Sequence, residues 1–107
     1  GIDKLDFLNA CWNDGNNPIR VIMGYWVDPN QDLSDQGVRQ NIVDDFKAYV
    51  NYYHDHPAVL MWQICSRLTN WYHQGNPADW YTLINALGWA AYQIEGADYH
   101  PVTTDCA

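Results

Sequence analysis

The sequence predicts an α/β fold with a parallel sheet. Three strand-like runs occur at residues 19–27, 59–64 and 100–104, and the first two are apolar enough to be covered on both faces. Longer stretches with the apolar period of a helix lie before and between these runs. Because strands that alternate with helices form βαβ units, we expect three parallel strands in a single domain that spans residues 1–107.

The first predicted helix covers residues 3–14, where apolar side chains recur on one face. Gly15 follows it and suits the position just after a helix end. The first strand, residues 19–27, comes after an Asn-Asn-Pro turn and ends at Asp28-Pro29.

A long helix is predicted to begin at Ser34 and Asp35, which are residue types that cap helix N-termini. Asp45 falls on another face than the apolar stripe of this helix and is expected to be solvated. The stripe has spacings of four, four, three and four, and it consists of Val38, Ile42, Phe46, Tyr49 and Tyr53.

The second strand, residues 59–64, is followed by a polar and aromatic loop. Pro77 suits the first position of the next helix, and Gly96 is expected to close it. Glu95 lies at the end of this helix and is expected to be solvated. The buried side of the helix is predicted to carry Leu83, Ile84, Leu87, Ala91 and Ile94.

The composition narrows the function classes. The net charge of −8 and the pI of about 4.4 argue against nucleic acid and anionic membranes as partners. No run of about 18 apolar residues is present, so no transmembrane helix is predicted. No Met begins the chain and no signal peptide is visible, which indicates an excised or processed piece. Six Trp and eight Tyr suit either a core or a sugar-binding cleft.

Two motifs carry a family resemblance. The strand that contains Trp62 and Ile64 resembles the fourth strand of retaining (β/α)8-barrel glycoside hydrolases, the cellulase-like, β-galactosidase-like and β-glucuronidase-like enzymes, which reads Trp-x-Ile-Gly-Asn-Glu. The His-Pro-Val-Thr run that begins at His100 resembles their fifth strand. The resemblance covers nearly the whole chain, from about the second helix to the fifth strand. It implies a parallel βαβαβ segment of an incomplete TIM barrel, because a complete one needs about 250 residues.

The resemblance also implies that hydrolysis has been lost. In the family the motif Glu is the acid/base, and a second Glu at the end of strand seven attacks the anomeric carbon. Here Arg67 stands at the acid position, Ser66 replaces the Asn that binds the sugar, and Cys65 replaces the Gly. An arginine cannot deliver a proton near neutral pH, and strand seven is absent from the 107 residues. We therefore expect a degenerate module that is not catalytic as it stands and needs no cofactor.

Three tryptophans and one aspartate are the candidate sugar-binding residues. Trp26, Trp62 and Trp71 lie at or near the carboxyl ends of strands, where barrel enzymes build their sites. Trp62 also suits a core role. Asp28 follows the first strand, where it suits either a polar ligand contact or a turn before Pro29.

The cysteines and histidines predict no metal site. His54 and His56 lack a nearby third ligand. Cys65 and Cys106 end strands that are neighbours in the predicted sheet, about 4.8 Å apart, which falls within the Cα separation of about 4.4–6.8 Å that a disulfide accepts. Such a bridge would imply an extracellular or secreted protein. Cys11, on the first helix, is predicted to stay a free core thiol.

Two function hypotheses follow. The first is a glycoside-hydrolase-like module that binds carbohydrate without cleaving it. The second is a structural or self-assembling protein, because three strands with helices on one face leave the other face and the outer strand edges uncovered. Its partners would be copies of itself or the missing barrel segments. The sequence also leaves open that the chain is a fragment of a larger glycosidase.

Overall fold

The computed structural model describes residues 4–28, 31–65 and 77–104. Its elements alternate between helices and strands, as the sequence predicts. They are α1 (Lys4–Trp12), the short 3-10 helix η1 (Asn13–Gly15), β1 (Val21–Trp26), α2 (Gln36–Tyr53), β2 (Val59–Cys65), α4 (Pro77–Glu95), the 3-10 helix η2 (Gly96–Asp98) and β3 (Val102–Thr104).

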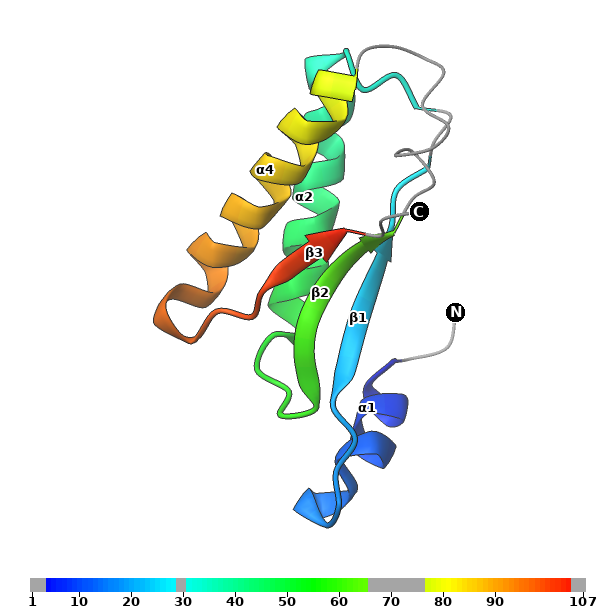
Figure 1. The fold of residues 1–107 in the computed structure, drawn as a ribbon, viewed down its shortest axis with the longest axis vertical. Helices are drawn as coiled ribbons and strands as arrows, with labels where there is room; N and C mark the ends of the chain where they lie inside the picture. The colour runs from blue at the N-terminus through cyan, green and yellow to red at the C-terminus, as the bar shows by residue number, and fades with distance from the viewer. Residues whose placement is uncertain (1–3, 29–30, 66–76, 105–107) are drawn as a thin grey trace.

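The three strands form one parallel sheet in the order β1-β2-β3. Figure 1 shows α2 and α4 side by side on one face of this sheet, with α1 beyond the lower end of β1. The α/β class and the parallel sheet are thus confirmed. Because all three strands point the same way, their carboxyl ends lie at one edge of the sheet.

The boundaries of α2 follow from local chemistry. The carboxylate of Asp35 accepts hydrogen bonds from the backbone N–H groups of Gly37 and Val38, at 2.7 and 3.3 Å, so Asp35 is the predicted N-cap. The predicted stripe faces the core, with Phe46 fully buried at its centre. At the end of α4, Gly96 adopts a φ of 64°, which an L side chain would strain.

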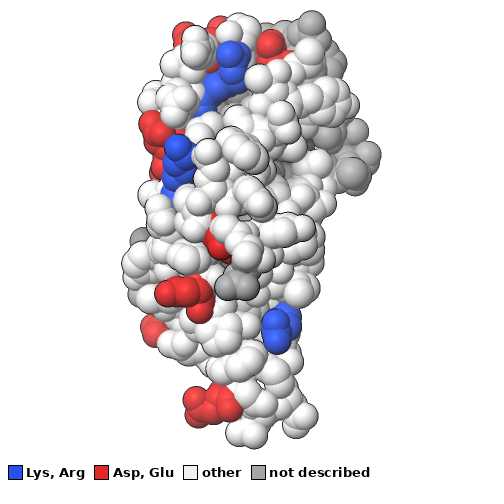
Figure 2. Space-filling view, turned by 90° about the vertical axis from the view of Figure 1, so that its left-hand side faces the viewer, with Lys and Arg blue, Asp and Glu red and all other residues white. Residues whose placement is uncertain are grey.

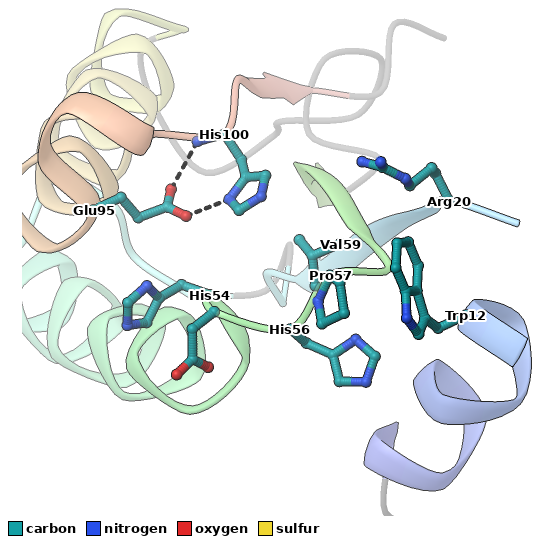
Figure 3. Close-up of a pocket in the computed structure, with 9 residues that line it drawn as sticks. Trp12, Arg20, His54, His56, Pro57, Val59, Glu95 and His100 are labelled. Carbon is teal, nitrogen blue, oxygen red and sulfur yellow. Dashed lines mark hydrogen bonds and ion pairs between the residues drawn. The ribbon is translucent and has the colours of Figure 1, made fainter. Parts of the chain in front are cut away.

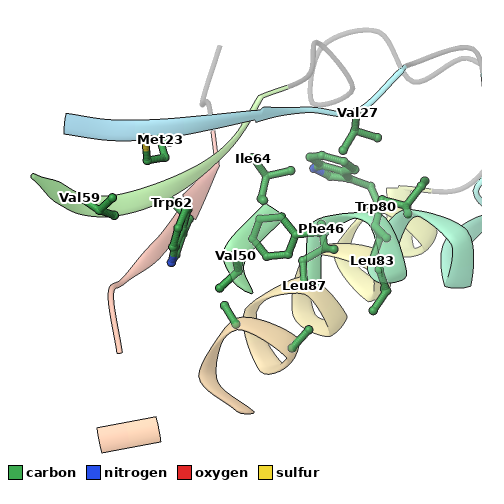
Figure 4. Close-up of a cluster of buried hydrophobic side chains, with 14 of the residues drawn as sticks. Met23, Val27, Phe46, Val50, Val59, Trp62, Ile64, Trp80, Leu83 and Leu87 are labelled. Atoms are coloured by element: carbon green, nitrogen blue, oxygen red, sulfur yellow. The ribbon is translucent and has the colours of Figure 1, made fainter. Parts of the chain in front are cut away.

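The core fills the layer between the sheet and the two long helices (Figure 4). Trp62 and Ile64 of β2 are fully buried in it, beneath α2 and α4. Side chains of a regular strand alternate between faces, but here the register shifts between Val21 and Ile22, so that Ile22 pairs with Met61 and Leu60 is left as an extra, exposed residue.

The opposite face of the sheet has no helix over it among the described residues. Ile22, Leu60 and Trp26 are exposed large apolar side chains on the strands. Parallel sheets are normally covered on both faces, so this face is an unusual apolar surface for a chain of this charge.

No helix in the described ranges combines the length and the apolarity that crossing a membrane requires. Figure 2 shows one face of the molecule, on which acidic and basic side chains are interspersed and the basic ones do not gather into a broad patch.

Candidate functional site

A hollow of about 250 Å³ opens beside the carboxyl end of β1. It brings together Trp26 and Asp28, two of the residues that the sequence nominates. Its lining is rich in amides, carboxylates and aromatic rings, and consists of Tyr25, Trp26, Val27, Asp28, Gln31, Asn41, Ile42 and Asp45.

The strand geometry turns Trp26 outward. Met23 and Tyr25 point toward the helix layer, and because side chains alternate along a strand, Trp26 points away from it. Its side chain is 59% exposed at the last position of β1. An indole with an open face next to hydrogen-bonding groups is the arrangement that a pyranose ring can stack on.

Tyr25 and Asp45 form the inner wall of this hollow. The Tyr25 hydroxyl donates to Oδ2 of Asp45 at 2.6 Å and so joins β1 to α2. Burial raises the pKa of the Tyr25 phenol well above its usual value, and the hydrogen bond to Asp45 and the charge of that carboxylate raise it further. The phenol therefore remains a donor, and the carboxylate of Asp45 stays anchored at the rim.

Asp45 is exposed, as the sequence predicts, and its hydrogen bond from Tyr25 makes it part of the site. Asn41 lies one turn before Asp45 on the same side of α2, which places an amide beside the carboxylate. The spacing of four residues between Asn41 and Asp45 indicates from the sequence that they share one side of the helix. The sequence does not indicate that they approach Tyr25, because this depends on how α2 packs on β1.

The chemistry available in this hollow is hydrogen bonding to hydroxyl groups and stacking on an indole. Carboxylates and amides accept and donate bonds in pairs, which matches the vicinal hydroxyls of a sugar. Metal binding lacks a basis in the described part of the chain, where no three His, Cys, Asp or Glu side chains lie close enough to share an ion.

Trp62 does not belong to this site. Its ring is fully buried in the helix layer, packed edge to face against Phe46 at a centroid distance of 6.4 Å. Neither ring face is open to a ligand, so the nomination of Trp62 as a stacking residue is wrong and its core role is the one observed.

Glu95 corrects a second expectation, because it is buried rather than solvated. Its side chain is only 1% exposed. Oε1 accepts from Nε1 of Trp62 and from the backbone N–H of His100, each at 3.0 Å, and Oε2 is bonded to Nδ1 of His100. Figure 3 shows the carboxylate between the end of α4 and the start of β3. This network ties α4, β2 and β3 together.

A larger hollow, of about 460 Å³, lies at the amino ends of the strands (Figure 3). His56 lines it but is fully engaged: Nδ1 accepts from the Ala58 N–H at 3.1 Å, which leaves Nε2 to donate to Oδ1 of Asn9 at 2.7 Å. His56 and His100 thus hold the entries to β2 and β3. The other lining residues are Trp12, Arg20, His54, Asp55, Pro57, Val59 and Glu95.

The remaining nominations cannot be placed. Ser66, Arg67, Trp71 and Cys106 lie outside the described residues, as does the side chain of Cys65. The pairing of Cys65 with Cys106 therefore stays a prediction. Cys11 is a free thiol, partly buried against the core, as predicted.

Comparisons with known proteins add no family to this description: no protein-family model, no curated protein and no solved structure matches the chain.

Proposed function

We propose that this chain is a segment of a (β/α)8 barrel related to retaining glycoside hydrolases, and that it binds neutral carbohydrate at the carboxyl end of β1 without hydrolysing it. The observation that carries the proposal is the exposed indole of Trp26 beside a hollow lined by carboxylates and amides. We further propose that the protein is secreted, where such ligands are abundant.

Three features support the relationship to barrels. The parallel order β1-β2-β3 with helices on one face is the arrangement that consecutive units of a (β/α)8 barrel have. The site also lies at the carboxyl end of a strand, the face on which barrel enzymes bind their substrates. The motif residues Trp62 and Ile64 pack beneath the helices at the strand where the resemblance places the acid/base.

Absence of hydrolysis follows from the residue at the acid position. Arg67 remains charged and has no proton to give near neutral pH. Among the described residues, Asp45 is one of the two carboxylates that line the hollow, and it is held by its hydrogen bond from Tyr25.

The Trp26→Ala variant is expected to lose cellobiose binding by about tenfold or more, because truncating an aromatic anchor removes on the order of 1–2 kcal/mol of contact energy. Trp26 is the last residue of β1 and its side chain is mostly exposed, so the fold should persist in circular dichroism. Isothermal titration calorimetry measures the affinity.

Tyr52→Ala is the matched control, since Tyr52 is exposed on α2 and lies outside the hollow. It should bind cellobiose as the unmodified chain does. The bound sugar should also stay intact over hours, even in the Ser66→Asn, Arg67→Glu double variant, because no nucleophile is supplied. Equal affinity in Trp26→Ala and the unmodified chain would refute this site, and cellobiose cleavage by the unmodified chain would refute the non-catalytic assignment.

A structural or self-assembling role is the second candidate, and the uncovered sheet face favours it. The exposed side chains of Ile22 and Trp26 lie on that face, and they form a surface that water disfavours. Copies of the chain, or further barrel units, would cover it.

This candidate predicts a concentration-dependent dimer or larger assembly. Ile22→Asp places a charge on the uncovered face and should shift the sedimentation coefficient to that of a monomer of 12.4 kDa. Tyr52→Asp, on the helix side, serves as its control. A monomer at micromolar concentration in the unmodified chain would exclude self-assembly and leave carbohydrate binding untouched.

A further inference from the structure

A second aromatic surface lies at the other side of the molecule, on α4 and the segment that leads into β3. We call Trp89, Tyr92 and Tyr99 the α4 platform. All three side chains are exposed, and Trp89 is 60% so. Soluble proteins seldom leave several large aromatic rings together in water unless the surface is used.

The rings of the platform hold one another in place. Trp89 and Tyr92 are stacked, with centroids 5.7 Å apart and planes only 19° from parallel. Tyr99 meets Tyr92 at 5.5 Å with a tilt of 61°. Because the rings are already ordered by these contacts, a ligand that stacks on them loses little side-chain entropy.

A hollow of about 490 Å³ adjoins the platform, and Tyr92 and Tyr99 also line it, so the surface is concave at this place. A Cβ at Gly88 would meet nothing within 4 Å, so the missing side chain leaves open space beside the rings. Among the residues that the structure describes, this hollow is lined by Gly88, Tyr92, Tyr99, His100 and Val102, none of which is an Asp, Glu, Lys or Arg.

His100 supplies a fixed polar group in this hollow. Glu95 holds Nδ1, and no described residue bonds Nε2. The two tyrosine hydroxyls add further donors and acceptors. The surface therefore offers flat apolar rings together with a few oriented polar groups.

We propose that the α4 platform is a second carbohydrate-binding surface, which takes a neutral β-linked oligosaccharide chain. Such a chain presents flat C–H faces to aromatic rings and hydroxyls at its edges, and it carries no charge. The described lining residues match this chemistry better than that of a protein partner, because Val102 alone among them has an aliphatic side chain. An anionic polymer would meet an acidic molecule of net charge −8.

The proposal reaches beyond the site at β1, because the two surfaces share no residue. Isothermal titration with cellohexaose tests it in four proteins: the unmodified chain, Trp89→Ala, Trp26→Ala, and Tyr81→Ala as the matched control. Tyr81 is also on α4 and is 65% exposed, but it neither contacts the platform rings nor lines the hollow.

Trp89→Ala should remove one of two binding events, or weaken it by about tenfold or more, while Tyr81→Ala leaves both unchanged. If the β1 site does not exist, Trp26→Ala will have no effect and Trp89→Ala will abolish all binding, which still supports the platform. Unchanged cellohexaose binding in Trp89→Ala overturns the inference. So does a fall of the sedimentation coefficient in Trp89→Ala alone, which would identify the platform as a contact between protein chains.

Discussion

Replacing Glu95 with alanine is expected to lower the free energy of unfolding by about 3–5 kcal/mol, because the variant leaves buried donors without their acceptor. The side chain of Glu95 is 1% exposed, and its carboxylate accepts from Nε1 of Trp62, from the backbone N–H of His100 and from Nδ1 of that histidine. Trp62 is itself fully buried, so the variant leaves its indole Nε1 without the acceptor that Glu95 supplies. Urea unfolding followed by tryptophan fluorescence measures the change.

Two further variants sharpen this experiment. Glu95→Gln keeps an oxygen for Trp62 and for the His100 N–H, but its amide group faces Nδ1 of His100, so a smaller loss of about 1–2 kcal/mol is expected. Asp6→Asn is the control, because Asp6 is an exposed acid on α1 and should change stability by no more than about 0.5 kcal/mol. A Glu95→Ala midpoint equal to that of Asp6→Asn would show that the network contributes nothing.

The sequence predicts the secondary structure well because its signals are local. Asp35 caps α2, Pro77 begins α4 and Gly96 ends it, and each of these effects acts within a few residues. The parallel sheet follows from the alternation of strands with helices. The observed strand β1 begins two residues later and ends one residue earlier than the predicted strand. Ile19 instead donates its N–H to the Cys11 carbonyl, a contact that no local pattern encodes.

Glu95 illustrates what the sequence alone could not supply. It sits one residue before the glycine that ends α4, a position where a charged side chain is normally solvated. Its burial depends on Trp62, 33 residues earlier in the chain. The hollow at β1 likewise depends on contacts between segments that are distant in the sequence. The sequence predicts Trp26 and Asp28 from their place at a strand end. The packing of α2 on β1 brings Tyr25 and Asp45 beside them.

Phe46→Ala is expected to lower the free energy of unfolding and to disturb the β1 hollow as well, because Phe46 joins the sheet to α2 at the centre of the core. Its ring meets Tyr25 edge to face at 5.0 Å, lies near Tyr49 at 6.4 Å and meets Trp62 at 6.4 Å. Phe46 is fully buried, and truncation of such a ring costs about 3–5 kcal/mol. That is a large share of the roughly 5–15 kcal/mol that stabilises a typical domain.

The loss should extend to the β1 hollow, since Tyr25 is held both by Phe46 and by its bond to Asp45. Phe46→Leu retains most of the volume and should cost only about 1–1.5 kcal/mol, while Tyr52→Ala, at an exposed position of the same helix, should cost less than that. Thermal unfolding by far-ultraviolet circular dichroism ranks the three, and cellobiose titration of the folded Phe46→Leu variant reports on the hollow. If Phe46→Ala unfolds at the same temperature as Tyr52→Ala, the aromatic cluster around Phe46 does not form the core. The placement of Tyr25 and Asp45 then loses its support.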